Sequence, residues 1–254
     1  MVEALLSVKN LYRRFGGIVA TDDLSLDVPR GELHAIIGPN GAGKTTLISQ
    51  LTGQLLPNTG TIHFAGQDVT RLPAYRRSAL GLARSFQITS LLKDFTAVDN
   101  VALAAQAHDG HSFRFWGKAR AEPHLRKAAM AALERVGLGP RADAVVSELS
   151  HGEQRELELA VALAAKPQML VLDEPMAGLG VTESARMVKL LQELRREVTI
   201  VLVEHDMDAV FALADRITVL VYGRVIACDV PAGIRQNAEV RRAYLGDQQV
   251  AGHG

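Results

Sequence analysis

The fold of this chain is decided by residues 38–45, Gly38-Pro39-Asn40-Gly41-Ala42-Gly43-Lys44-Thr45. The stretch matches the pattern G-x-x-x-x-G-K-[ST], whose glycines let main-chain N–H groups wrap closely around a chain of phosphates. Lys44 adds a point charge for the terminal phosphates, and the Thr45 hydroxyl is placed to bind Mg²⁺. An apolar run over residues 33–37 precedes the stretch and a helical pattern over residues 44–51 follows it, the context that such a loop requires. We therefore predict a nucleotide phosphate site here, and we extend it to Thr46.

A second motif is an apolar strand that ends in two acids, Met169-Leu170-Val171-Leu172-Asp173-Glu174-Pro175. In α/β folds the carboxyl edge of a parallel sheet is where ligands bind. Asp173 is predicted to hold Mg²⁺ directly or through water, and Glu174 to polarise a water for attack on the terminal phosphate. The alternative, two solvated acids at an ordinary strand end, is disfavoured by the phosphate loop in the same chain.

A third motif, Leu149-Ser150-His151-Gly152-Glu153-Gln154, precedes a predicted helix that runs to Ala165. Ser150 with Glu153 three residues later predicts a capping box. A helix N-terminus with Ser and Gly is also suited to bind an anion, so a second phosphate-binding surface is the other interpretation. The residues alone do not separate these two roles, which are compatible.

The remaining pattern predicts an α/β fold. Leu24, Leu26 and Val28 alternate with polar residues as in a half-buried strand. From residue 169 onward strands alternate with helices: strands over 169–172 and 198–203, helices over 182–196 and 206–214, then two strands around 222–223. This alternation predicts a P-loop NTPase core with a mostly parallel sheet. We expect an N-terminal antiparallel β portion, a helical subdomain inserted over about residues 88–150, and a tail from about residue 230, all within one domain over 1–254.

Composition excludes several classes of protein. The 254 residues include 28 Lys plus Arg and 28 Asp plus Glu, a balance that disfavours nucleic acid as the main partner. The single cysteine, Cys228, rules out an intrachain disulfide framework, and its apolar surroundings predict a buried thiol. The N-terminus lacks a secretory signal and no apolar stretch reaches 18 residues, which predicts a cytoplasmic protein that would need a membrane-embedded partner to work at a membrane.

Taken together, GPNGAGKT (38–45), SFQ (85–87), LSHGEQ (149–154), LVLDEP (170–175) and VEHD (203–206) resemble the motifs of the nucleotide-binding subunit of ATP-binding cassette (ABC) transporters. The long helical insert and three further stretches are similar to those of the ATP-binding subunits of branched-chain amino acid importers. The three stretches are RFGGIVATDDLSLDV (14–28), EHDMDAVFALADRITVLVYGRVIA (204–227) and PAGIRQNAEVRRAYLG (231–246).

The resemblance implies roles for further residues. Gln87 would sense Mg²⁺ and the attacking water, and His205 would contact the γ-phosphate. Ser150 and Gly152 would contact the γ-phosphate of ATP held by a second subunit. Phe15 would stack on adenine, with Tyr12 as the competing choice. Two positions depart from the family pattern: His151 replaces a usual glycine, and Gly180 lies in a segment that lacks the usual aspartate.

The resemblance also implies a function. We expect an ATPase that uses ATP and Mg²⁺, pairs with itself or a paralogous subunit, and drives transmembrane permease subunits at the cytoplasmic face of the inner membrane. A periplasmic solute-binding protein would deliver branched-chain amino acids or related small polar solutes. The alternatives are a lipopolysaccharide-export ATPase, a non-transport ABC ATPase and a non-catalytic nucleotide-binding regulator. The 63 positions from Gln87 to Ser150 favour the importer type.

An aromatic patch over residues 111–116, His111-Ser112-Phe113-Arg114-Phe115-Trp116, has two interpretations. It packs within the helical insert, or it forms an interaction surface near the groove that receives the permease.

Overall fold

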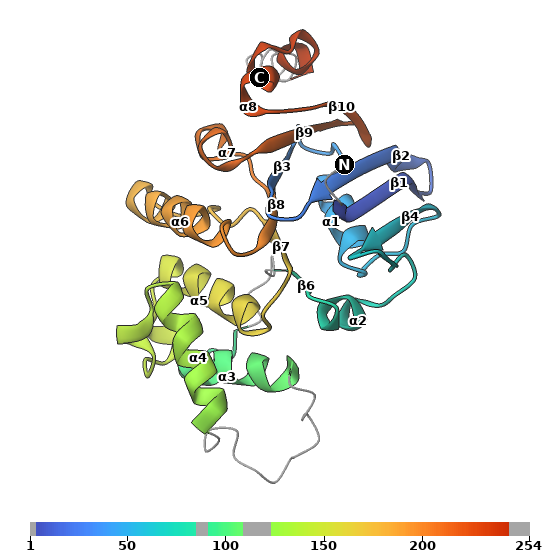
Figure 1. Ribbon diagram of the computed structural model, residues 1–254. Coiled ribbons are helices and arrows are strands. Elements are labelled where there is room, and N and C mark those ends of the chain that lie inside the picture. The colour runs from blue at the N-terminus through green and yellow to red at the C-terminus, as the bar shows by residue number, and fades with distance from the viewer. Residues whose placement is uncertain (1–3, 85–90, 109–122, 244–254) are drawn as a thin grey trace.

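The computed structural model describes residues 4–84, 91–108 and 123–243, and its strands form two sheets (Figure 1). The first sheet is antiparallel, has the strand order β2-β1-β4-β5 and lies near the N-terminus. Its strands are β1 (Ala4–Phe15), β2 (Ile18–Pro29), β4 (Thr59–Phe64) and β5 (Gln67–Asp68). The predicted N-terminal antiparallel portion is therefore present.

The second sheet has the order β10-β9-β3-β8-β7-β6 and is parallel except for β10. Its strands are β3 (Leu33–Ile37), β6 (Leu82–Arg84), β7 (Met169–Asp173), β8 (Thr199–Val203), β9 (Arg216–Val221) and β10 (Arg224–Asp229). Every residue of β3, β7 and β8 is buried. These strands are mostly apolar along their whole length because both faces of the sheet are covered.

The two faces of the second sheet pack against different layers. Leu170, Leu172 and Leu202 belong to a core shared with helices that lie before and after them in the chain. Val171, Val201 and Val203 belong to a core shared with the antiparallel sheet and with α1 (Lys44–Leu51). Successive side chains of a strand point to opposite faces, so one apolar run supplies both cores.

The other helices are α2 (Ala74–Ala79), α3 (Ala97–His108), α4 (Pro123–Arg135), α5 (His151–Ala164), α6 (Val181–Leu194), α7 (Met207–Leu213) and α8 (Pro231–Gln236). Two 3₁₀ turns, Gly139–Arg141 and Val146–Glu148, precede α5. Helices α3, α4 and α5 pack against one another at the lower end of Figure 1. The helix-rich segment falls where the insert was predicted, while the domain limits themselves stay a prediction.

A buried arginine fixes the end of α1, the helix that follows the phosphate loop. Arg77 is 0 % exposed, and its guanidinium donates to the carbonyls of Gln50 at 2.7 Å and Leu51 at 2.6 Å, and also to Thr70 and Leu72. Burial lowers the pKa of Arg77 to about 10. The arginine satisfies carbonyls that a helix C-terminus leaves without partners, and its charge suits that end of the helix dipole.

One prediction is wrong. Cys228 is exposed, although its apolar neighbours predicted a buried thiol. It lies on β10, which is at the edge of the second sheet and, among the described strands, pairs with β9 alone, so this part of the strand faces solvent.

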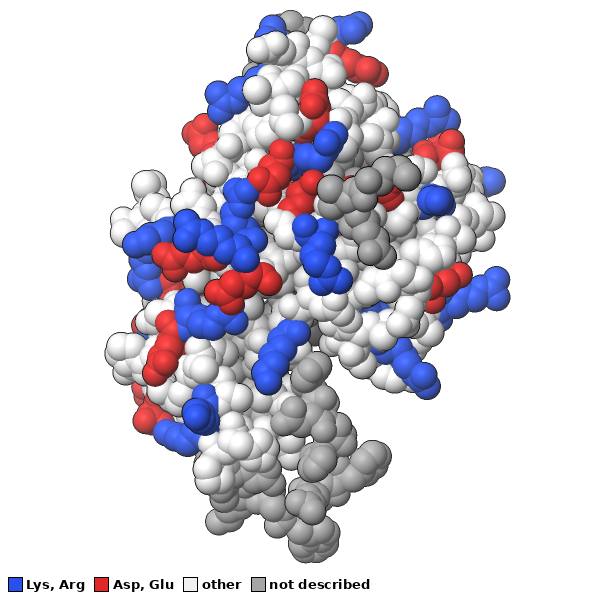
Figure 2. Space-filling model, viewed as in Figure 1, with Lys and Arg blue, Asp and Glu red and all other residues white. Residues whose placement is uncertain are grey.

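In the part of the chain that the structure describes, none of the helices has the length and apolar character needed to traverse a bilayer. On the face seen in Figure 2, basic and acidic side chains are intermixed.

Candidate functional site

The phosphate loop connects β3 to α1 and is shaped by close main-chain contacts. Gly43 has φ +101°, and a Cβ atom there would lie 2.1 Å from the carbonyl oxygen of Ala20 on β2. Only glycine fits such a position. The N–H of Gly223, in the turn between β9 and β10, donates to the Ala42 carbonyl at 2.9 Å. Both sheets therefore hold the loop in place.

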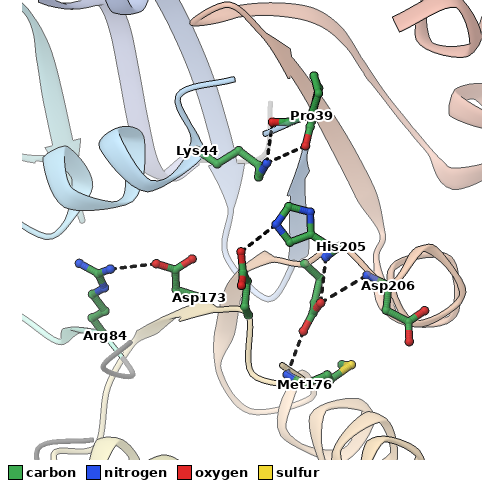
Figure 3. A network of polar contacts seen from close by, with 10 residues as sticks. Pro39, Lys44, Arg84, Asp173, Met176, His205 and Asp206 are labelled. Atoms are coloured by element: carbon green, nitrogen blue, oxygen red, sulfur yellow. Dashed lines mark hydrogen bonds and ion pairs between the residues drawn. The ribbon is translucent and has the colours of Figure 1, made fainter. Parts of the chain in front are cut away.

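Lys44 is 7 % exposed and folds back over the loop that precedes it (Figure 3). Its Nζ donates to the carbonyls of Gly38 at 2.6 Å and Pro39 at 2.9 Å. Burial lowers the pKa of the Lys44 ammonium, and the charges of Glu174 and Asp173 oppose that shift. The lysine thus shares one electrostatic site with the two acids that end β7.

Glu174 directly follows β7, and it pairs with His205, which lies just after β8 and is labelled in Figure 3. His205 Nε2 lies 2.7 Å from Glu174 Oε1, and the side chains are 46 % and 34 % exposed. Glu174 has φ +51°, an uncommon conformation for a non-glycine residue, and its N–H donates to the Val203 carbonyl at 2.8 Å. Both side chains are thus partly open to solvent, and the contact with His205 fixes one oxygen of the Glu174 carboxylate.

Asp173 is 4 % exposed and accepts from Arg84, which ends β6: Arg84 Nη2 lies 2.9 Å from Asp173 Oδ2. Its other oxygen, Oδ1, is buried and has no hydrogen-bond partner. Burial raises the pKa of the Asp173 carboxyl, and the Arg84 charge opposes this. Sequence analysis missed Arg84, because β6 has only three residues and shows no periodicity.

Glu204, which directly follows β8, was also missed. Its carboxylate is buried and accepts from three main-chain N–H groups: Met176 at 2.9 Å, His205 at 2.8 Å and Asp206 at 3.4 Å. It therefore ties the loop after Glu174 to the loop that carries His205 (Figure 3). The stretch VEHD contains Glu204, but nothing in that stretch indicates that its partner is Met176.

The helix start at Ser150 forms the predicted capping box. Ser150 Oγ accepts from the Glu153 N–H at 3.2 Å, and Glu153 Oε2 accepts from the Ser150 N–H at 2.8 Å. Gly152 lies against Glu183 of α6, where an added Cβ would come 2.5 Å from Glu183 Oε1. Glu183 in turn accepts from the N–H of Gly180 at 3.1 Å.

The two departures from the family pattern lie in the same region. The ring of His151 lies beside Gly178, with Cε1 3.3 Å from where a Cβ of Gly178 would be. Gly180 is the N-cap of α6. The start of α5 therefore packs against the start of α6: Gly152 lies against Glu183, and His151 lies beside Gly178 in the segment that leads into α6.

Phe15 and Tyr12 differ in exposure. Phe15 is 45 % exposed at the end of β1, with the Arg13 guanidinium 4.7 Å from its ring centre. Tyr12 is half-buried and paired with Thr59 on β4. Gln87 and the patch over residues 111–116 lie outside the described residues.

Comparison with known proteins decides the family. Residues 21–177 match the family described as ABC transporter. This chain belongs to the ABC transporter family. Residues 224–249 of the cassette also match the family described as branched-chain amino acid ATP-binding cassette transporter. These matches confirm the predicted family and its class of enzyme, the ABC ATPases.

Relatives align over nearly the whole cassette. It is 40% identical to the high-affinity branched-chain amino acid transport ATP-binding protein LivG of Escherichia coli K12, over 97% of this chain and 100% of LivG. It is 37% identical to BraF of Pseudomonas aeruginosa, which carries the same description, with the same coverage. The crystal structure of the ADP conformation of an ATP-binding cassette of an ABC transporter superposes with a TM-score of 0.86 at 29% identity, covering 96% of this chain and 99% of that one. The P-loop NTPase fold is therefore confirmed.

Proposed function

We propose that this cassette hydrolyses ATP with Mg²⁺ as the motor subunit of an importer for branched-chain amino acids or related small polar solutes. The observation that carries the proposal is the meeting of Lys44, Asp173, Glu174 and His205 at one edge of the parallel sheet (Figure 3). The four come from three separate segments of the chain. The relatives named for branched-chain amino acid transport and the match over residues 224–249 support the importer over the lipopolysaccharide-export alternative.

The residues present fit a magnesium ion. Mg²⁺ in nucleotide sites is bound by one or two carboxylates together with phosphate oxygens and water. The Asp173 oxygen that has no partner is such a ligand, and Thr45 Oγ and Gln87 would complete the protein's share. No group of three or more His, Cys, Asp or Glu side chains gathers among the described residues. When bound, the ion would neutralise charge on the phosphates.

Catalysis in this proposal is a matter of position and charge. When ATP binds, the Lys44 ammonium gives up its hydrogen bonds to the Gly38 and Pro39 carbonyls and bonds to the β- and γ-phosphates instead. The N–H groups of the loop and of the start of α1 bind the remaining phosphate oxygens. Glu174 polarises the attacking water, while His205 orients Glu174 and contacts the γ-phosphate. Phe15, the more exposed of the two aromatic candidates, stacks on adenine.

A second subunit completes the site in this proposal. Ser150 and Gly152 reach the γ-phosphate of ATP bound by the partner, so ATP holds two cassettes together and hydrolysis releases them. Such a two-state switch can drive a membrane protein.

A groove supports the proposed docking of permease subunits. It has a volume of about 530 Å³ and lies between α2 and β6 on one side and α3 and α5 on the other. Tyr75, Ala104 and Val161 are among its mostly apolar lining residues. A short permease helix fits such a surface, since amphipathic helices bind in apolar grooves. The cassette would then lie at the cytoplasmic face of the inner membrane. A periplasmic binding protein would supply the solute from the opposite side of that membrane.

Phosphate release from ATP by the purified chain, together with calorimetry, tests the proposal. Glu174→Gln should bind ATP with unchanged affinity, form a long-lived dimer and lose phosphate release by about 10²–10⁴-fold, the range for a general base. The control is Glu197→Gln, the same change at a side chain that is 63% exposed and paired with Arg135. No calorimetric heat with ATP and magnesium, or normal turnover in Glu174→Gln, would contradict the proposal. The identity of the solute is tested by measuring the uptake of labelled leucine, isoleucine and valine in cells that contain this chain and in cells that lack it.

A further inference from the structure

We infer that Arg84 is a positioning residue for the metal: it holds Asp173 so that a single carboxylate oxygen is presented to Mg²⁺. This inference rests on the proposed function, because it concerns the ion that accompanies ATP. It is drawn from the contacts of Arg84 and from the oxygen of Asp173 that those contacts leave free.

Arg84 contacts Asp173 because of the strand order. Strand β6 runs parallel to β7, and Arg84 is paired in register with Val171. The guanidinium thus reaches the end of the next strand, where Nη2 lies 2.9 Å from Asp173 Oδ2. The two side chains are 9% and 1% exposed, so solvent competes little for this bond.

Arg84 contacts only one of the two carboxylate oxygens of Asp173. One oxygen of Asp173 is occupied by Arg84, and the other is buried without a partner. A buried polar atom without a partner is rare in native proteins, and an ion that binds there is one of the accepted reasons. A carboxylate with one oxygen fixed cannot rotate freely, so its second oxygen keeps one direction.

Arg84 is itself anchored at its other amino group. Nη1 donates to Gln54 Oε1, and the Gln54 N–H donates to the Ser49 carbonyl at 3.0 Å, at the end of α1. The planar fork of an arginine can serve two partners in fixed directions, which a lysine cannot do. Arg84 therefore sets Asp173 relative to α1, the helix that begins with Lys44 and Thr45.

Stability alone is a weak reason for such a pair. A buried ion pair repays the cost of desolvation poorly, and apolar residues of similar volume are often as stable. In metal sites, by contrast, groups that hydrogen-bond to the ligands orient them, and their loss typically weakens metal affinity 10–100-fold. Oxygens of Glu156 and Glu158 are also buried without partners, but Asp173 is the one of these three acids whose charge acts on Lys44, and this favours the second explanation.

The test is Arg84→Lys, which keeps the positive charge and loses the fork. The probe is Mn²⁺, whose binding to protein saturated with a non-hydrolysable ATP analogue is measured by electron paramagnetic resonance. We expect Arg84→Lys to weaken Mn²⁺ binding about tenfold. Affinity for the analogue in EDTA should stay within twofold of wild type, because the phosphate loop is untouched.

Two further variants keep the test decisive. Arg186→Lys is the control for the same chemical change, since Arg186, which is 56% exposed, pairs at 2.6 Å with another buried acid, Glu156. It should leave Mn²⁺ affinity unchanged. Gln54→Ala removes the second anchor and should weaken Mn²⁺ binding in the same direction, and it serves if Arg84→Lys does not fold.

The outcomes separate the two proposals. Wild-type protein that binds neither the analogue nor Mn²⁺ would refute the proposed function. If wild-type protein binds both the analogue and Mn²⁺, and Arg84→Lys and Gln54→Ala bind Mn²⁺ with the same affinity as wild type, only the role of Arg84 is refuted. Tighter Mn²⁺ binding in Arg84→Lys than in wild type would also overturn it, since Arg84 would then hinder the binding of the metal.

Discussion

Glu204→Gln is the change that tests how the loop after Glu174 and the loop that carries His205 are held together. Glu204 is 4% exposed, and its carboxylate accepts from Met176 with one oxygen and from His205 and Asp206 with the other. Glutamine has nearly the same shape but only one accepting oxygen. Whichever way its amide faces, the NH₂ group meets a main-chain N–H and at least one buried donor loses its partner.

The expected cost follows from that geometry. A buried donor without a partner costs about 1–3 kcal/mol, and a hydrogen bond that loses its charged acceptor weakens by about 1 kcal/mol. Together these give a loss of about 2–4 kcal/mol in the free energy of unfolding, a large part of the roughly 5–15 kcal/mol typical of a folded protein. Because Glu204 links the segments that carry Glu174 and His205, the distance between that pair should also become less well defined, and kcat should fall.

Urea denaturation measures the stability loss, and phosphate release at saturating ATP, below the unfolding transition, measures kcat. ATP affinity should stay within about twofold of wild type, because the donors to the Glu204 carboxylate among the described residues, Met176, His205 and Asp206, lie outside the phosphate loop. Glu197→Gln, at an exposed site, is the control for the same chemical change. Stability equal to that of the control would refute the energetic reasoning. Reduced stability with unchanged kcat would show that Glu204 supports the fold without positioning the pair.

Three further changes give clear expectations. Gly43→Ala should abolish ATP binding in calorimetry, because the new Cβ would lie 2.1 Å from a main-chain oxygen. In the control Gly41→Ala the new Cβ has nothing within 4 Å, so the variant should lose only about 1–2 kcal/mol of stability, the cost of its left-handed backbone. Similar behaviour of the two variants would contradict this reasoning. Arg77→Met leaves several carbonyls without their donor and should lower the free energy of unfolding by about 3 kcal/mol or more in urea, and a loss below about 1 kcal/mol would count against it. Burial raises the pKa of Glu158 in the folded protein above 4.5, so its contribution to stability is present below that pH and is lost as pH rises through the folded pKa. Glu158→Gln should therefore raise the melting temperature relative to wild type more at pH 7 than at pH 4, and an equal offset at both would exclude this cause.

The sequence by itself determined the features whose signals are local. The apolar run over residues 33–37 and the helix over residues 44–51 have the predicted limits, because strand and helix periods and the phosphate-loop pattern are written in adjacent residues. The capping box at Ser150 was predictable for the same reason, since its two partners are three residues apart. Helix α6 ends at Leu194, two residues before the predicted limit, and Arg195 is its C-cap.

Only the tertiary structure decided which side chains meet. Arg84 and Asp173 are 89 residues apart, and they touch because β6 lies next to β7 in the sheet. His205 meets Glu174, 31 residues away, because β8 also neighbours β7. The exposure of Cys228 likewise follows from the edge position of its strand. Strand order depends on how the whole chain buries its apolar faces, and no local stretch of sequence carries that information.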